Sequence, residues 1–496
     1  MLISRRPEKK RRTAPRRALT AGRVLGIVCG AVALNIVAPT SADAGSSSQL
    51  AYVSEGSTFI DAFDSSSDTW LGQDISTGST YGASGVAVAP NGLDTYVTDA
   101  YEEGTTKGSL SVISTATNAA VAQISLPESP LGPIAIAPNG KTAYVVAFQD
   151  VIPVDLATDI AGTPIPTPIT GGGGDLSIAV TPNGKTAYVP TSKLGPCTSA
   201  TTCYGVVLPI DLTNNTVGAQ IDVPDYVGTW PDGYQEALSG GIAIAPAGKV
   251  AYVVMNAVGI LAAGWVTPID TATNTVGSQI PAGDAPTLIV ITPNGKTAYV
   301  NNSSSDNAVT GVTPLDLKTN TPEAQIPRPA CPSGSGSYLG PMAIVPSGAT
   351  LYLMCTINSQ MIAIDTATNS AGSPSASPST YGTPTGIAFV PDQAPTAAFT
   401  VTSAPAGSPT TFNASSSSSP VGTIASYAWN FGDGHTLKTT HASITHTYAT
   451  ANTFSVTLTV TNSQGTSTKK VFTGNTMSNN GGPTAKVVER VTIPAG

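Results

Sequence analysis

Short apolar stretches separated by Gly, Pro, Asn and Ser recur along most of the chain, at intervals of about 45 residues. The clearest unit is an apolar stretch that ends in Pro-x-Gly and is followed by a stretch containing Tyr-Val, as at 134–145 and 178–189. A second unit, apolar-x-Asp-x-x-Thr-Asn, comes after it, as at 269–274. The proline of the first unit occurs seven times, at Pro90, Pro138, Pro182, Pro246, Pro293, Pro346 and Pro391. Each repeat predicts four short strands, which is typical of one blade of a β-propeller.

The two ends of the repeat array complement each other. Residues 49–53 match the second strand of a blade, and residues 385–391 match a lone first strand. Together they would complete one blade from both termini, which leaves no open edge between the first and last blades. The pattern predicts an all-β protein with a seven-bladed propeller over residues 45–391, whose closing blade is shared by both ends.

The repeated polar residues are those that turns require. Asn-Gly between two apolar strands, as at Asn139-Gly140, favours a hairpin in which both residues have positive φ. The recurring Asp can accept hydrogen bonds from backbone N–H groups two residues on. Because each Asp belongs to the turn of its own repeat, we expect these side chains to be spread around the ring rather than gathered round a metal ion.

The Tyr-Val and Pro-Asn-Gly copies resemble the YVTN family of β-propeller repeats, found in bacterial and archaeal surface and secreted proteins. Tyr96-Val97-Thr98-Asp99 comes nearest to the motif that gives the family its name. The resemblance covers residues 49–391 and implies the fold. It implies little about function, because the family hosts many roles.

A second domain follows a short linker at 392–395. Alternating positions such as 454–460 and a single tryptophan, Trp429, predict an immunoglobulin-like β-sandwich over residues 396–474. The stretch 429–434, Trp-Asn-Phe-Gly-Asp-Gly, resembles the Trp-Asp-Phe-Gly-Asp-Gly motif of PKD domains, with Asn in place of the first Asp. The resemblance implies a spacer or an adhesion module for proteins or polysaccharides.

Within this domain we expect Trp429 to pack in the core and Asp433 to cap the Gly-rich turn. Some PKD domains bind calcium, and Asn413 is the candidate ligand for it here. No Cys or carboxylate stands near His441 and His446 in the sequence, so we expect no metal role for them. Residues 475–496 are predicted to be a flexible tail.

The first 44 residues differ from the rest. Basic residues crowd positions 5–23, an apolar stretch spans 24–37, and Ala-Asp-Ala at 42–44 is a small-x-small cleavage site. This layout predicts a secretory signal peptide over 1–44, with an uncleaved anchor as the alternative. The arginine pairs leave both general secretory and twin-arginine export open. We therefore expect a secreted, extracellular or cell-wall-associated protein with no transmembrane segment after signal removal.

Removal of the signal makes the chain more acidic. It leaves 13 basic residues (22 − 9) and 28 acidic residues (30 − 2), a net charge of −15. Such a surface repels phosphate backbones, which disfavours nucleic acid as a partner.

Cys29 would leave with the signal, and four cysteines remain. An even number in an exported chain indicates two disulfides, predicted as Cys197–Cys203 and Cys331–Cys355. Metal binding by these four is the alternative, although their spacing contains no Cys-x-x-Cys unit.

All three histidines lie beyond residue 391, so the seven blades contain no His base or His metal ligand. The chain also loosely resembles propeller lactonases and the streptogramin lyase, and that resemblance implies polar clusters that usually include His. An enzyme built on this propeller would have to use carboxylates or Tyr for acid–base work.

The irregular segments are the second-to-third loops of the blades and the crossings between blades. Variable loops on a rigid scaffold are where binding residues usually stand. Aromatic and acidic side chains there would suit a sugar, or a calcium ion with oxygen ligands. The candidate ligand-binding residues are Tyr101, Glu102, Glu103, Tyr226, Trp230, Asp232, Tyr234 and Glu236.

Three functions stay open at this point. The leading hypothesis is a non-catalytic binding or adhesion protein, whose ligand is a cell-wall glycan, a peptide or an extracellular protein. The second is a lyase or hydrolase that uses carboxylates on the same face. The third is a structural component of a wall or biofilm. For the loops themselves, the alternative to a binding site is that they are merely solvated, with their aromatic side chains packed over the blade edges.

Overall fold

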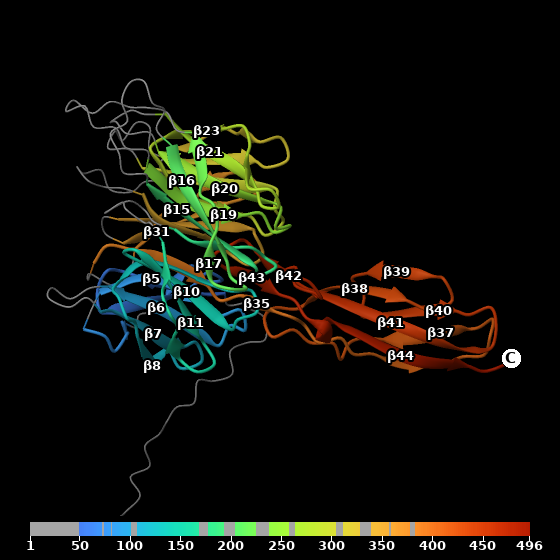
Figure 1. Ribbon diagram of the computed structural model, residues 1–496. Coiled ribbons are helices and arrows are strands. Elements are labelled where there is room, and N and C mark those ends of the chain that lie inside the picture. The colour runs from blue at the N-terminus through green and yellow to red at the C-terminus, as the bar shows by residue number, and fades with distance from the viewer. Residues whose placement is uncertain are drawn as a thin grey trace, which may run out of the picture. The chain divides into compact units, whose positions relative to one another are not determined.

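The computed structural model describes residues 49–71, 74–80, 82–100, 107–167, 177–192, 204–224, 238–256, 263–303, 311–327, 339–356, 359–376 and 382–496. Residues 45–496 belong to one compact unit. Apart from a single 3₁₀ turn, η1 (Pro483–Ala485), all regular structure in the described residues is β (Figure 1). None of these residues forms a helix long and apolar enough to cross a membrane.

The repeats form antiparallel sheets, which we number sheets 1 to 7 in chain order. Sheet 1 contains β1 (Leu50–Ser54), β2 (Phe59–Asp64), β3 (Thr69–Trp70), β4 (Ile75–Ser76) and β34 (Gly386–Phe389). Sheet 2 contains β5 (Gly82–Val88), β6 (Asp94–Ala100), β7 (Ser109–Ser114) and β8 (Ala119–Ser125). Sheet 3 contains β9 (Pro130–Ile136), β10 (Thr142–Ala147), β11 (Asp150–Asp155), β12 (Ile160–Ala161) and β13 (Ile165–Pro166). Sheet 4 contains β14 (Ala179–Val180), β15 (Thr186–Ser192), β16 (Tyr204–Asp211), β17 (Thr216–Val217) and β18 (Ile221–Pro224).

Sheets 5 to 7 follow the same plan. Sheet 5 contains β19 (Leu238–Ile244), β20 (Val250–Asn256), β21 (Ala263–Asp270), β22 (Thr275–Val276) and β23 (Ile280–Asp284). Sheet 6 contains β24 (Pro286–Ile291), β25 (Thr297–Asn302), β26 (Gly311–Asp316), β27 (Thr321–Pro322) and β28 (Ile326–Pro327). Sheet 7 contains β29 (Leu339–Ile344), β30 (Thr350–Cys355), β31 (Gln360–Asp365), β32 (Ser370–Ala371) and β33 (Ser375–Ala376). Except in sheet 2, the fourth strand is broken into two short pieces that pair with opposite ends of the third strand.

In each sheet the strand that contains the repeat tyrosine is buried on both faces, because neighbouring sheets pack against each other. This strand is β1 in sheet 1 and the second strand in chain order in the other sheets. Between sheets 2 and 3, for example, one apolar cluster combines Leu110 and Ile124 with Ile136, Val145 and Ile152. This explains the continuous apolar stretches around Tyr-Val, which lack the alternation of a half-solvated sheet. The packing of sheet on sheet makes this part of the chain a β-propeller.

In five of the seven sheets, the tyrosine of the repeat forms a hydrogen bond to the next sheet. The hydroxyl of Tyr188 in sheet 4 donates to Oδ1 of Asn274 in sheet 5, at 2.8 Å. Tyr299 in sheet 6 makes the same bond to Asn369 in sheet 7, also at 2.8 Å. The other such pairs are Tyr52–Asn118, Tyr252–Asn320 and Tyr352–Asp68. The last pair joins sheet 7 to sheet 1, and β1 also pairs with β34 from the far end of the repeats.

The Asp of the repeat acts as predicted. Oδ1 of Asp270 accepts hydrogen bonds from the backbone N–H groups of Ala272 and Thr273, at 2.9 and 3.0 Å. Asn274 ends this turn with a positive φ of 57°, which points its amide toward the tyrosine of the previous sheet. These hydrogen bonds to the charged form lower the pKa of the Asp270 carboxyl.

The Pro-x-Gly turn differs from the prediction in one respect. Gly140 has a positive φ of 71°, but Asn139 does not. The Gly140 N–H bonds to the Ala137 carbonyl at 2.8 Å, and the Asn139 side chain accepts from the Lys141 N–H at 2.9 Å. Pro at the second position favours this type I geometry, since its fixed φ is negative, so the expectation of two positive φ values was wrong.

The C-terminal domain is a two-sheet sandwich, as predicted. One sheet contains β36 (Thr400–Thr402), β37 (Pro409–Asn413) and β40 (Ser443–Thr447). The other contains β38 (Ile424–Asn430), β39 (Thr436–Thr439), β41 (Asn452–Asn462) and β44 (Lys486–Ile493). Trp429 is buried between them and packs against Phe399 and Phe412.

Two expectations for this region are corrected. Residues 475–496 are not a flexible tail over their length, because β44 pairs with β41 from Lys486 to Ile493 and buries Val491 and Ile493. Residues 392–395 are not a free linker, because β35 (Asp392–Gln393) pairs in parallel with β43 (Met477–Asn480). The carboxylate of Asp392 is buried there and accepts a 2.7 Å hydrogen bond from Asn462.

A hairpin of β42 (Lys470–Phe472) and β43 docks on the propeller through its turn, which we call the docking turn (473–476). The Gly474 carbonyl accepts from the Val180 N–H at 2.7 Å, and the Thr473 carbonyl accepts from the Ile244 N–H at 3.0 Å. Phe472 and Met477 join the apolar core of sheets 3 and 4. The turn therefore satisfies edge N–H groups of first strands in two sheets.

Candidate functional site

The eight candidate ligand-binding residues of the loops and crossings all lie outside the described residues: Tyr101, Glu102, Glu103, Tyr226, Trp230, Asp232, Tyr234 and Glu236. Their segments join described strands, the first connecting β6 to β7 and the second connecting β18 to β19. Antiparallel strands reverse direction at each connection, so the described strand ends on either side of these segments lie at the opposite end of the sheet from the Pro-x-Gly turns. Their role in binding stays a prediction.

Three of the four predicted disulfide cysteines, Cys197, Cys203 and Cys331, also lie outside the described residues. Cys355 ends β30, is fully buried and takes part in a disulfide. The proposed pairing of Cys355 with Cys331 stays a prediction.

Asp99 is a buried carboxylate one residue before the end of β6, at the base of the first candidate loop. Its Oδ2 accepts hydrogen bonds from the hydroxyls of Ser109 and Ser111, at 2.8 and 2.7 Å. Burial raises the pKa of Asp99 to about 6, although these hydroxyls favour the charged form. The last position of the Tyr-Val-Thr-Asp segment therefore carries a perturbed acid.

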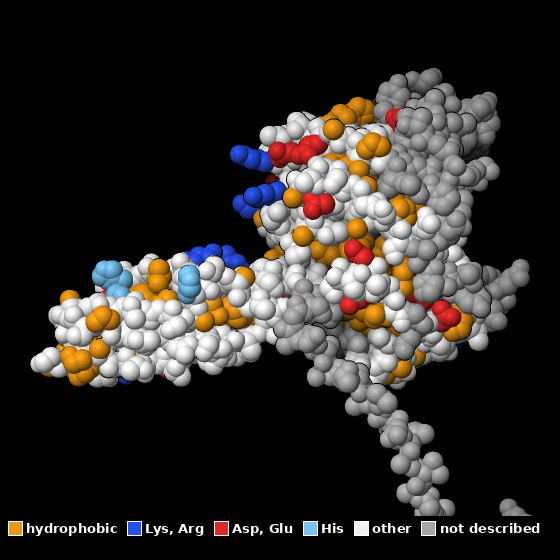
Figure 2. All heavy atoms as spheres, turned by 180° about the vertical axis from the view of Figure 1, so that it is seen from behind, with side chains coloured by type: hydrophobic (Ala, Val, Ile, Leu, Met, Phe, Trp, Pro, Cys, Tyr) orange, Lys and Arg blue, Asp and Glu red, His pale blue; other side chains and the backbone are white. Residues whose placement is uncertain are grey.

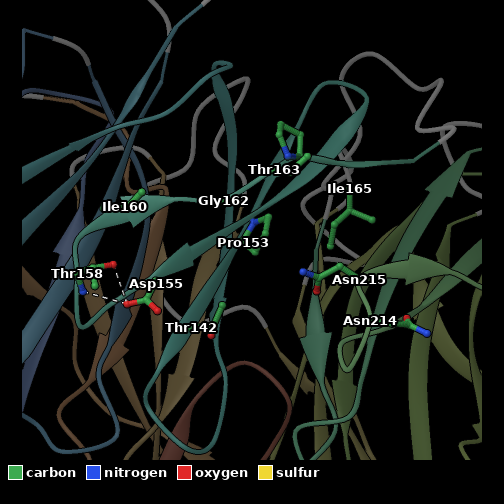
Figure 3. Close-up of a pocket in the computed structure, with 11 residues that line it drawn as sticks. Thr142, Pro153, Asp155, Thr158, Ile160, Gly162, Thr163, Ile165, Asn214 and Asn215 are labelled. Carbon is green, nitrogen blue, oxygen red and sulfur yellow. Dashed lines mark hydrogen bonds between the residues drawn. The ribbon is translucent and has the colours of Figure 1, made fainter.

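The grooves between neighbouring sheets recur with the repeat. One groove, with a volume of about 590 Å³, is lined by Pro153, Asp155 and Gly162 of sheet 3 and by Asn215 of sheet 4 (Figure 3). Another, with a volume of about 500 Å³, has Pro268, Asp270, Gly277 and Asn320 in the corresponding places of sheets 5 and 6. Because the same residue types line both grooves, they are a product of the repeat rather than one specialised site.

The first strands surround a central cavity of about 650 Å³. Its described lining comes from these strands, such as Gly132, Gly241 and Leu339, and from the docking turn, including Thr473 and Asn475. None of the described lining residues is Asp, Glu, His, Lys or Arg. The described part of this cavity thus offers hydroxyls, amides and backbone groups but no acid or base.

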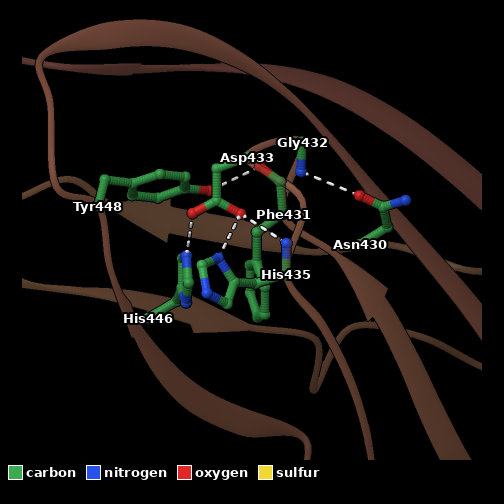
Figure 4. Close-up of polar contacts among 7 residues, drawn as sticks. All are labelled: Asn430, Phe431, Gly432, Asp433, His435, His446 and Tyr448. Atoms are coloured by element: carbon green, nitrogen blue, oxygen red, sulfur yellow. Dashed lines mark hydrogen bonds and ion pairs between the residues drawn. The ribbon is translucent and has the colours of Figure 1, made fainter.

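The C-terminal domain brings together three side chains that could hold a metal ion, Asp433, His435 and His446, which we call the Asp–His cluster (Figure 4). Nε2 of His446 lies 2.7 Å from Oδ2 of Asp433, and Nδ1 of His435 lies 3.3 Å from Oδ1. It is the one such group among the residues that the structure describes. The cluster is not apparent in the sequence, because Asp433 lies in a turn and His446 lies 13 positions later, on β40. The expectation that no carboxylate lies near His446 was therefore wrong.

The turn holds Asp433 in place, as predicted. Its Oδ1 accepts from the His435 N–H at 3.0 Å, and Asn430 accepts from the Gly432 N–H, also at 3.0 Å. Gly432 has a φ of 79°, and a Cβ there would lie 2.6 Å from the Ser455 carbonyl oxygen, so no other residue fits.

Aromatic rings fix His446. Its imidazole stacks on Phe431 at 4.0 Å between ring centroids and meets the edge of Tyr448 at 4.6 Å. Its side chain is 13% exposed, whereas that of His435 is 73% exposed. Partial burial disfavours the charged Asp433, but the hydrogen bonds from His446 and the His435 N–H outweigh it and lower the pKa of Asp433. A charged carboxylate therefore faces two imidazoles.

Figure 2 shows His side chains over the C-terminal sandwich, and single acidic and basic side chains spread over the rest of the described surface. Large exposed hydrophobic residues are also scattered, among them Leu93, Phe148 and Ile160. Isolated apolar residues of this kind are normal on soluble proteins and mark no site by themselves.

Residues 392–475 match the PKD domain family. The match covers the sandwich up to the docking turn and stops before β44. The Trp429–Gly434 motif, the buried tryptophan and the two-sheet sandwich all lie inside it. From here on we call the whole two-sheet sandwich, with β44 included, the PKD domain.

No curated protein matches the chain as a relative. Among solved structures, a functionally unknown protein of Desulfotomaculum acetoxidans is 18% identical with a TM-score of 0.48, covering 69% of this chain and 99% of its own. A putative 6-phosphogluconolactonase of Bacteroides fragilis is 16% identical with a TM-score of 0.47, covering 71% and 100%. The β-propeller domain of Cps50 from Myceliophteria thermophila is 10% identical with a TM-score of 0.46, covering 61% and 89%. At this level of similarity, none of these proteins informs function.

Proposed function

We propose that the chain is an exported, non-catalytic binding or adhesion protein. In this proposal a YVTN-type propeller holds a glycan, a peptide or a cell-surface partner on the face formed by the second-to-third loops and the crossings. The PKD domain serves as spacer or accessory binding module. The signal-like residues 1–44 and the occurrence of PKD domains in extracellular proteins support export to the cell surface or medium.

The observation that carries the proposal is how the repeated polar groups are used. Repeat tyrosines such as Tyr188 and Tyr299 donate to turn residues of the next sheet, and repeat aspartates such as Asp270 accept from their own turns. The described lining of the central cavity adds no acid or base. The repeats therefore supply a scaffold, and ligand chemistry is left to the loops between them.

We further propose that sheets 1 to 7 are the blades of a closed seven-bladed ring. The pairing of β1 with β34 and the bond from Tyr352 to Asp68 support closure, since both join the two ends of the repeat array. A closed ring keeps the loop face rigid, which lowers the entropic cost of ligand binding.

One observation favours the enzyme alternative. The raised pKa of Asp99, about 6, is of the kind found in catalytic acids and bases, and Asp99 closely precedes the segment with Tyr101, Glu102 and Glu103 in the sequence. Against it, Asn302 occupies the same repeat position in sheet 6 and makes purely structural hydrogen bonds, to Ala282 and from Thr313. We therefore rank binding above catalysis.

The test is binding of the mature protein to polysaccharides and isolated cell walls, with and without calcium. Replacing Tyr226, Trp230 and Tyr234 together by alanine should abolish binding, because aromatic anchors dominate such interfaces. The matched control replaces Leu93 and Ile160, exposed apolar residues at Pro-x-Gly and Asp turns, and should bind normally. Unchanged binding by the triple variant would reject the crossing as the site.

A further inference from the structure

We propose that the Asp–His cluster of the PKD domain binds a divalent transition-metal ion of the zinc class. The ligands would be one carboxylate oxygen of Asp433, Nδ1 of His435 and Nε2 of His446, whose ligand atoms all lie within 4.8 Å of one another (Figure 4). Two imidazoles with one carboxylate are a donor set that suits zinc, nickel or copper.

The distances are close to those that a metal would impose. Ligand atoms about 2.1 Å from a tetrahedral ion stand about 3.4 Å apart. His435 Nδ1 lies 3.3 Å from Oδ1 of Asp433, which already fits, and His446 Nε2 lies 2.7 Å from Oδ2, which has to open by under about 1 Å. Because these are the two oxygens of one carboxylate, the carboxylate also has to turn so that a single oxygen faces both rings. The exposed His435 ring is free to adjust, while the stacked His446 ring stays fixed.

Protonation is compatible with this role. Oδ1 of Asp433 accepts the His435 N–H, and a carboxylate oxygen has a further lone pair to offer to an ion. To bind the ion, neutral His446 must carry its proton on Nδ1, so that Nε2 offers a lone pair in place of its hydrogen bond to Asp433. Solvent water would fill the open coordination position on the side of His435, whose side chain is 73% exposed.

Charge and donor type discriminate between metals. Calcium prefers six or more oxygen ligands, and the cluster supplies a single carboxylate. We therefore expect zinc or nickel to bind where calcium does not. The site differs from the Asn413 position considered for calcium, since Thr410 is the residue of β37 that lies opposite His446, whereas Asn413 lies opposite Ser443.

The experiment titrates Zn²⁺, Ni²⁺ and Ca²⁺ into the tag-free mature protein after chelator treatment, with calorimetry and a chromophoric zinc competitor as readouts. We expect one Zn²⁺ per chain and no heat from Ca²⁺. His435→Ala should weaken Zn²⁺ binding by at least about tenfold without unfolding the domain, because His435 packs in no core. Co²⁺ should give visible ligand-field absorption that is lost in the same variant.

His441→Ala is the matched control. His441 is exposed, lies near the cluster in sequence and bonds only to Thr439 in its own loop. Full Zn²⁺ affinity in His441→Ala together with loss in His435→Ala supports the site. The proposal would be overturned if the wild type bound no stoichiometric Zn²⁺, or if both variants lost Zn²⁺ affinity equally. The cluster would then serve only to stabilise the turn through its hydrogen bonds.

Discussion

At the scale of single residues, Asp99 and Asn302 show how one repeat position adapts. Both stand three residues after the tyrosine of a second strand. Asn302 donates from Nδ2 to the Ala282 carbonyl at 2.6 Å and accepts from Thr313 at 2.7 Å. A charged Asp99 can only accept hydrogen bonds. Burial disfavours this charged form and therefore raises the pKa of Asp99. The asparagine is the better fit to this position at neutral pH.

Asp99→Asn should therefore stabilise the protein at pH 7.5 by about 1 to 3 kcal/mol and much less at pH 4. An acid whose folded pKa lies at about 6, above its ordinary 3.8, adds stability below pH 3.8 that is lost as pH rises through 6. The difference in unfolding free energy between variant and wild type, measured by denaturant at both pH values, checks this.

Asn302→Asp is the reciprocal control and should destabilise more at pH 7.5 than at pH 4. If the difference in unfolding free energy between wild type and Asp99→Asn were the same at both pH values, the burial of a charged Asp99 would be contradicted.

At the scale of elements, the docking turn depends on one glycine. Gly474 has a φ of 105°, and a Cβ on it would lie 3.0 Å from both the Ala179 Cβ and the Ile244 nitrogen. The backbone bonds of the turn to Val180 and Ile244 leave little room for either side to shift. A small side chain there would push the hairpin off sheets 4 and 5.

Gly474→Val should lower the stability of the hairpin contact by about 2 kcal/mol or more and expose the turn to proteases. Gly465→Val is the matched control, because Gly465 has a similar φ of 85° and a Cβ added to it would meet no heavy atom within 4 Å. It bears the backbone strain without the clash. Thermal unfolding and limited proteolysis of both variants measure the difference; equal effects would mean that the contact contributes nothing.

The sequence allowed the strands of the repeats to be predicted, because Pro-x-Gly, Tyr-Val and the Asp turn each carry a local physical signal. It did not allow the docking hairpin to be predicted, and β44 was missed although Lys486–Ile493 is rich in β-branched residues. Met477–Asn480 is Met-Ser-Asn-Asn, which has neither alternation nor β-branched residues, and it forms a strand because β42 and β35 pair with it on its two sides. The Asp–His cluster was missed because it too depends on a contact between residues that are distant in the sequence. His446 on β40 meets Asp433, which stands 13 positions earlier in a turn.

At the scale of the whole molecule, the PKD domain needs its last strand. β44 pairs with β41 over eight residues and places Val491 and Ile493 in the core with Trp429. Each such buried side chain contributes about 1.5 to 3 kcal/mol, against a total of about 5 to 15 kcal/mol for a typical domain.

Ending the chain after Ala485 should therefore unfold the PKD domain, whereas ending it after Ile493 should leave its melting temperature within a few degrees of the full chain. Circular dichroism melts of both truncations, with protease digestion as a second readout, test this. A folded domain in the shorter chain would show that β44 is dispensable.

The pairing of β1 with β34 also affects how the protein folds during its synthesis. Leu50–Ser54 emerges early in synthesis, yet Gly386–Phe389, its partner along one edge, is added only after the other repeats. Until then that edge carries free N–H and C=O groups, a template on which a second nascent chain can pair. The pairing of β1 with β34 is thus a late, long-range folding step, and slow release of the C-terminal part should favour swapped dimers and aggregates over monomers.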